Sequence, residues 1–247
     1  MTYTEYPPHP DLIPYIKCFW SYSSDKASSE NPNIIIPDNC SDILIDIDGD
    51  GKALSSFIGT MTRPIHSAKK SVIGIRFRPG YAYAFFGIPM SEFSNTIVQL
   101  DDFWDGARQL EDGIRSLGNV VQQINYLQAM LMINRERTLH LDIRFQVALH
   151  KMAEYSAHNS IETISLGLGL SRQHLRRLFQ KYVGINPIQF LKIDRVIRVI
   201  EYLRQQKGPV NLSHIAYDFG YYDQSHMNMD FRKMTTSPPS AFLRNNP

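Results

Sequence analysis

The sequence has only two cysteines among its 247 residues, Cys18 and Cys40. Two cysteines are too few for a disulfide scaffold or a four-cysteine zinc site. They are not spaced as a C-x-x-C pair, so buried apolar filler is a better interpretation than a nucleophile. The G-x-S-x-G, H-E-x-x-H and Walker patterns are also missing. The sequence therefore predicts no enzyme and no cofactor.

Metal ligands are scarce in the first half of the chain. The acidic run Asp46–Gly51 resembles the opening of a calcium loop, but its twelfth position, where an EF-hand needs a carboxylate, is Phe57. Flanking helices are not evident, and residues 1–137 contain only His9 and His66 as imidazole ligands. We expect no metal site.

Long hydrophobic runs are missing as well. The longest stretch without charge, residues 116–134, is interrupted by glycine, asparagine and glutamine, which is an amphipathic pattern and not a membrane span. The first ten residues lack the basic start and apolar run of a secretory signal. With 43% hydrophobic and 20% charged residues, the composition is that of a globular protein, and we expect a soluble cytoplasmic one without membrane partners.

No sign of charge dominates the whole chain, whose net charge is +2, but the two halves differ. Residues 1–137 carry 12 Lys and Arg against 16 Asp and Glu, a net charge of −4. Residues 138–247 carry 14 against 8, a net charge of +6. This asymmetry predicts two domains, 1–137 and 138–247, and a basic second half is compatible with a polyanion such as DNA.

The first half predicts short strands. Ile43, Ile45 and Ile47 alternate with more polar neighbours, which is typical of a half-buried strand, and residues 73–77 and 34–36 give two further candidates. Several short strands with turn signals favour a small barrel or sandwich.

Helical spacing begins after about residue 81. Apolar residues recur at helical intervals over 107–117, and again over 120–131 in an a/d-like stripe. This second stripe fits either a dimerisation helix or a helix packed on its own barrel.

The second half contains an internal repeat. Leu175, Phe179, Gly184 and Pro187 correspond to Met227, Phe231, Thr236 and Pro239 at a constant offset of 52 residues. Further upstream, Ile164 corresponds to Ile215 at an offset of 51, so one residue is inserted in the second turn. The chain therefore carries a duplicated unit.

Each unit is predicted to be two helices joined by a tight turn, over about 160–182 and 211–234. Ser160, Ser171 and Asp223 are candidate N-caps, and Leu175, Leu178, Phe179 and Tyr182 form the apolar stripe of the second helix of the first unit. Residues 188–206 between the units carry their own apolar stripe and predict a long linking helix that ends at Gly208-Pro209.

The outward faces of the two second helices predict DNA recognition. An α-helix fits the major groove of B-DNA, where arginine pairs with guanine and glutamine or asparagine pairs with adenine. A solvated basic face on a helical bundle is the alternative, but the repeat and the linking helix favour DNA. The candidate DNA-binding residues are Arg172, Gln173, Arg176, Arg177 and Gln180 in the first unit, and Gln224, Ser225, Asn228, Met229 and Arg232 in the second.

The second half resembles the AraC/XylS family of bacterial transcriptional regulators over about residues 141–245. The resemblance lies in SRQHLRRLFQKYVGINP, residues 171–187, and in IAYDFGYYDQSHMNMDFRKMTTSPPSAFLR, residues 215–244. It implies an all-α double helix-turn-helix domain whose recognition helices, at about 171–182 and 223–234, enter successive major-groove segments.

Two departures from the family pattern matter. Thr236 stands where the family usually has glycine, so it must avoid or strain a positive φ. Met229 stands where the family commonly has arginine, so we expect the first recognition helix to provide most of the direct base recognition.

The first half resembles a module attached to such regulators, in residues 6–22, 34–47 and 74–89. The resemblance implies an α+β chain in which a small cupin-like β-barrel and helices precede the DNA-binding domain. It implies effector sensing, dimerisation or both, and leaves the effector, a homodimer and RNA polymerase open as partners. Arg76 and Arg78 could bind an anionic effector, or they could form surface salt bridges.

The predicted function is sequence-specific binding of double-stranded DNA, at an operator or promoter, by a transcriptional regulator or activator. Two alternatives remain from the sequence. One is a DNA-repair alkyl-transfer enzyme, which would need a reactive cysteine. The other is a small-molecule binding protein with only non-specific, salt-sensitive affinity for DNA.

Overall fold

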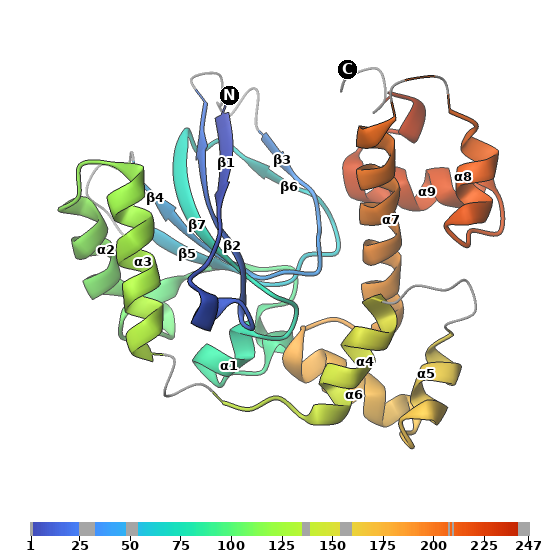
Figure 1. The fold of residues 1–247 in the computed structure, drawn as a ribbon, viewed down its shortest axis with the longest axis horizontal. Helices are drawn as coiled ribbons and strands as arrows, with labels where there is room; N and C mark the ends of the chain where they lie inside the picture. The colour runs from blue at the N-terminus through green and yellow to red at the C-terminus, as the bar shows by residue number, and fades with distance from the viewer. Residues whose placement is uncertain are drawn as a thin grey trace.

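A computed structural model describes residues 2–24, 33–47, 54–134, 139–153, 160–206, 208 and 210–241. It consists of a β-sheet domain followed by a helical domain (Figure 1). The predicted two-domain α+β architecture is therefore confirmed. In the described residues, no helix is long and apolar enough to cross a membrane.

The N-terminal domain is built on an antiparallel six-stranded sheet in the order β1-β2-β7-β4-β5-β8. Its strands are β1 (Thr2–Tyr6), β2 (Ile16–Ser23), β4 (Asp42–Asp46), β5 (Ser55–Ile58), β7 (Ser71–Phe77) and β8 (Ile97–Gln99). Two further strands, β3 (Asn33–Ile35) and β6 (Ile65–Ser67), pair with each other in a separate ribbon.

The described strands do not close into the expected barrel. β1 and β8 are the two ends of the strand order, so the six-stranded sheet is open, and the β3–β6 ribbon lies over one of its faces. The sequence indicated the strands correctly but not their closure, because closure depends on pairing between distant segments.

The half-buried strand predicted around Ile43 is in fact buried on both faces. Ile43 and Ile45 belong to the main core of the domain. Asp42 and Leu44 point to the opposite face and are also buried, because the β3–β6 ribbon covers that side.

Helices cover the other face of the sheet. α2 (Ala107–Arg115) and α3 (Val120–Asn134) lie side by side there (Figure 1). Ile124, Leu127 and Leu131 of α3 are buried in the main core together with residues of the sheet. The apolar stripe that the sequence left open is therefore used for packing within the domain.

Short helices complete the N-terminal domain. They are η1 (Pro10–Leu12), α1 (Ala82–Phe86), η2 (Met90–Phe93) and η3 (Leu100–Asp102). Of these, α1 and η2 pack against the helical domain.

The C-terminal domain is organised along one long helix, α7 (Pro187–Gln205). α4 (Ile143–Ala153), α5 (Ile161–Gly167) and α6 (Arg172–Tyr182) gather at one end of it, and α8 (Leu212–Asp218) and α9 (Gln224–Thr235) at the other (Figure 1). Buried residues of all six helices form a single core cluster, so α7 is the common support of both helix pairs.

Candidate nucleic-acid interface

The two repeat units have the same local geometry. In the first, the Ser171 hydroxyl accepts a hydrogen bond from the His174 amide at 3.1 Å. In the second, the Asp223 carboxylate accepts one from the His226 amide at 2.7 Å. These N-caps fix the start of α6 and of α9 at the same point of each unit.

The turns between the paired helices also match. Gly169 and Gly220 both have positive φ angles, of 62° and 69°. The Leu170 amide donates to the Ser165 carbonyl at 2.9 Å, and the Tyr221 amide donates to the Ala216 carbonyl at 2.8 Å. Leu170 and Tyr221 therefore correspond, and the residue inserted in the second unit is Tyr222.

The inward faces of both second helices are buried, and for α6 the sequence predicted this. Leu175, Leu178, Phe179 and Tyr182 of α6 lie in the core of the domain. Met227, Phe231 and Met234 of α9 occupy the same core. Burial of these stripes fixes which side of each helix remains outside.

The outward face of α6 carries the first group of candidate residues. Arg172, Gln173, Arg176 and Arg177 are exposed, and Gln180 is half-buried. The Arg172 guanidinium donates to the Glu162 carboxylate of α5, which ties it to the preceding helix. Arg176 and Arg177 are therefore better placed to reach a base edge than Arg172.

The outward face of α9 is less basic. Ser225, Met229 and Arg232 are exposed, and Met229 leaves 49% of its surface accessible. Gln224 and Asn228 are half-buried. In this group only Arg232 carries a charge.

The first residue of each recognition helix is held by the helix before it. Gln224 accepts a hydrogen bond from the Ser213 hydroxyl of α8 at 2.8 Å, and it occupies the position that Arg172 occupies in the first unit. In both units this contact braces the angle between the paired helices.

One exposed residue beside this surface was not predicted from the sequence. Tyr222 is 93% exposed and directly precedes the N-cap Asp223 of α9. The one-residue insertion was visible in the repeat alignment and was the signal that could have identified it.

The other reactive groups give little support to catalysis. Cys18 and Cys40 are both buried. Burial raises the pKa of the Cys18 thiol to about 12 and that of Cys40 well above its ordinary value. A protonated, inaccessible thiol is a poor nucleophile for alkyl transfer.

The anion site considered for Arg76 and Arg78 is not favoured. The Arg76 guanidinium donates to Asp42 at 3.0 Å and lies 3.4 Å from Asp38. Although burial opposes its charge, these carboxylates hold the pKa of Arg76 above its ordinary value. Arg78 donates to the Ile13 carbonyl at 2.7 Å. Both arginines are therefore engaged by the protein itself.

Metal ligands do not gather in the part of the chain that the structure describes, where no group of three His, Cys, Asp or Glu side chains could hold an ion. Asp48, Asp50 and Gly51 of the calcium-like run lie outside those residues.

Comparison with known proteins divides the chain in the same way as the fold. A family described as "Helix-turn-helix domain" matches residues 164–245, and a "Domain of unknown function (DUF6597)" matches residues 4–99. The curated "Multiple antibiotic resistance protein MarA" of Escherichia coli is 22% identical over 105 residues, which cover 40% of this chain and 81% of MarA.

Solved structures with similar folds include the C-terminal domain of AraT, a response regulator from Geobacillus stearothermophilus. It is 22% identical, and the match covers 43% of this chain and 88% of the AraT domain, with a TM-score of 0.40. ToxT from Vibrio cholerae is 11% identical, and the match covers 92% of this chain and 96% of ToxT, with a TM-score of 0.43.

Proposed function

Because the chain belongs to the AraC/XylS family of transcription regulators, we propose that it recognises an operator through α6 and α9 in successive major-groove segments. The protein is a DNA-binding transcriptional regulator.

One observation carries the proposal. Two helix pairs with the same caps and turns stand at opposite ends of α7, and each leaves one face of its second helix outside the shared core (Figure 1). A single rigid helix that supports two such faces suits one protein molecule bound to two neighbouring groove segments.

The residue types on the two helices suit different kinds of DNA contact. Arg176 and Arg177 of α6 are exposed and can donate to guanine, with about 1–3 kcal/mol of discrimination for a good bidentate pair. On α9, Met229 offers only apolar contact, so Arg232 and Tyr222 are proposed to bind the DNA backbone. Base recognition is therefore expected to depend mostly on α6.

The N-terminal domain is proposed to modulate DNA binding. We propose that it binds a small-molecule effector or a second copy of the chain. Its contacts with α6 and α7 provide a path by which either could change the DNA affinity. We further propose that the protein acts in the cytoplasm and that RNA polymerase is a partner at its promoter.

The test is selection of bound sequences from a random duplex library with the full chain, repeated at two salt concentrations. Two enriched blocks about one helical turn apart would support recognition by both units. A single enriched sequence block would support base recognition mostly by α6. No enrichment, with binding lost as the salt concentration rises, would contradict the proposal.

Arg176→Ala tests the assignment directly. We expect it to weaken binding to the selected duplex by about 1–3 kcal/mol and to relax the preference at one base pair. Substitution of Lys151, on α4, by alanine is the control for loss of one positive charge. Unchanged affinity and preference in Arg176→Ala would remove this residue from base recognition.

A further inference from the structure

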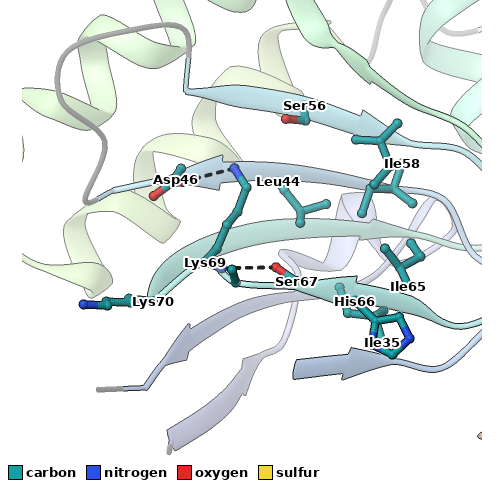
Figure 2. Close-up of a pocket in the computed structure, with 12 residues that line it drawn as sticks. Ile35, Leu44, Asp46, Ser56, Ile58, Ile65, His66, Ser67, Lys69 and Lys70 are labelled. Atoms are coloured by element: carbon teal, nitrogen blue, oxygen red, sulfur yellow. Dashed lines mark hydrogen bonds and ion pairs between the residues drawn. The ribbon is translucent and has the colours of Figure 1, made fainter. Parts of the chain in front are cut away.

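A cavity separates the six-stranded sheet from the β3–β6 ribbon. Its two lobes, of about 520 and 500 Å³, share Ile35, Leu44, Ile58, Ile65 and Ser67. Figure 2 shows these sheet and ribbon side chains around the first lobe. Side chains normally fill the space between two packed sheets, so open space of this size between the sheet and the ribbon makes a candidate ligand site.

The second lobe opens toward the helical domain. Ile197, Ile200, Glu201 and Arg204 of α7 line it together with residues of the sheet. A molecule in this lobe would contact the N-terminal domain and the helix that supports both DNA-binding units at the same time.

Aromatic side chains form one wall. The Trp20 and Tyr3 rings lie 6.1 Å apart, and Tyr22 follows on the same strand face as Trp20. Gly74 of β7 lies directly beneath the indole, because a Cβ at this position would come within 2.2 Å of the Trp20 ring. The sheet is thus shaped to hold a flat aromatic surface toward the cavity.

The charged side chains at this wall neutralise one another. Asp42 accepts from Arg76 and from the Trp20 indole, each at 3.0 Å. Asp38 lies 3.4 Å from Arg76 and 3.9 Å from Lys17. In the first lobe, Lys69 lies 3.1 Å from Asp46 (Figure 2). The charges balance over the two lobes together, so the lining has no net charge for an ionic ligand to pair with. The five cations are Lys17, Lys69, Lys70, Arg76 and Arg204, and the five carboxylates are Glu5, Asp38, Asp42, Asp46 and Glu201.

Two residues that line this lobe carry buried polar atoms. The Tyr22 hydroxyl and the Asn33 amide nitrogen have no hydrogen bond to any residue that the structure describes. Such groups are costly to bury alone, and a ligand oxygen would satisfy them. Both can donate, so the complementary group on a ligand is an acceptor such as a carbonyl or hydroxyl oxygen.

We propose that this cavity binds an uncharged, largely apolar molecule with a hydrogen-bonding oxygen, and that its contact with α7 links occupancy to DNA affinity. The first part stands on the cavity itself. The link to DNA rests on the proposed function.

Nile red, an uncharged carbonyl-containing dye whose emission depends on polarity, is a suitable probe for the full chain. We expect one saturable site with blue-shifted emission. An anionic naphthalenesulfonate dye should bind about tenfold more weakly, because its charge would be desolvated without a partner.

Three variants test the location. Ser67→Trp, which fills the space shared by both lobes, should abolish Nile red binding, whereas Ile133→Trp on the exposed side of α3 should leave it unchanged. Tyr22→Phe should weaken binding about fivefold while raising the melting temperature of the free protein, because it removes an unpaired buried hydroxyl. The proposed site would be overturned if Ser67→Trp bound Nile red as well as the native chain does. It would also be overturned if the native chain preferred the anionic dye.

The link to α7 is measured separately. Saturating Nile red should change the affinity of the native chain for its selected duplex, and should not change that of Ser67→Trp. An unchanged affinity despite bound dye would overturn the link alone. If the chain selects no duplex sequence, the proposed function fails, and the dye titration still tests the cavity.

Discussion

At the residue scale, the repeat shows how two equivalent positions can tolerate different side chains. Gly184 and Thr236 end α6 and α9 and both have positive φ, 93° and 65°. A Cβ on Gly184 would lie 2.6 Å from the Met90 carbonyl oxygen of the N-terminal domain. Thr236 is exposed, so its Cβ meets no such obstacle. Packing and backbone both require glycine at 184, whereas only backbone conformation favours it at 236.

Thr236→Gly should therefore stabilise the protein. A β-branched residue in the left-handed region is strained, and relief of that strain outweighs the greater freedom of glycine in the unfolded chain, for a net gain of about 0.5–1 kcal/mol. Denaturant unfolding of the full chain measures this. Thr236→Ala is the control, since it keeps a Cβ in the same conformation. If the glycine variant were no more stable than the alanine variant, Thr236 would not be under backbone strain.

At the element scale, α6 and α9 share a framework but differ in chemistry. Arg176, Arg177 and Gln180 of α6 correspond to Asn228, Met229 and Arg232 of α9. The Asn228 side-chain oxygen is buried and has no hydrogen bond to a described residue, so it is not presented to solvent. The second helix thus offers fewer groups to a base edge than the first.

Met229→Arg should add a second positive charge to the outward face of α9, at the position that Arg177 occupies in α6. Met229 is already half exposed, so arginine can be accommodated without repacking. We expect tighter DNA binding and a salt dependence steeper by about one unit in the slope of log affinity against log salt. Affinity for the selected duplex at several salt concentrations measures both. Met229→Leu should match the native chain, and an arginine variant with an unchanged slope would place this position away from the DNA.

The sequence predicted these helices because the signals that define each of them lie within a few neighbouring residues. Caps at Ser171 and Asp223 and the stripe from Leu175 to Tyr182 can be recognised within one helix. The open sheet could not be predicted in this way. β7 pairs with both β2 and β4, across distant parts of the chain, and the burial of Leu44 depends on the separate β3–β6 ribbon.

The candidate site was predictable to the same extent. The exposed faces of α6 and α9 follow from periodicity, and their contacts with DNA stay predictions. The Glu162 and Ser213 contacts join side chains of two different helices, and they could not be read from one helix. The repeat alignment shows that one residue is inserted, but the matching backbone hydrogen bonds were needed to identify it as Tyr222. Its exposure is a property of the folded chain.

At the scale of the whole molecule, the first DNA-binding unit is packed against the N-terminal domain. The Asn39 amide donates to the Phe190 carbonyl of α7 at 3.0 Å in a buried contact. The Tyr83 and Tyr182 rings lie 5.0 Å apart, and the Lys181 ammonium lies 4.9 Å from the Tyr83 ring. Gly184 sits against Met90 at the same junction. A change in the N-terminal domain can therefore reach α6 and the start of α7 directly.

Gly184→Ala tests this junction, and Gly169→Ala is its matched control. Both glycines have positive φ and end a helix of the first unit, but a Cβ at 169 meets nothing within 4 Å, whereas one at 184 meets the Met90 backbone. Backbone strain should cost each variant about 1–2 kcal/mol, and the clash should add about 1–3 kcal/mol at 184 only. Unfolding measurements give the difference, and limited proteolysis between the domains should speed up only in Gly184→Ala. Equal losses in the two variants would mean that the domains separate freely in solution, and modulation of DNA binding would then have to act by dimer geometry instead of by direct contact.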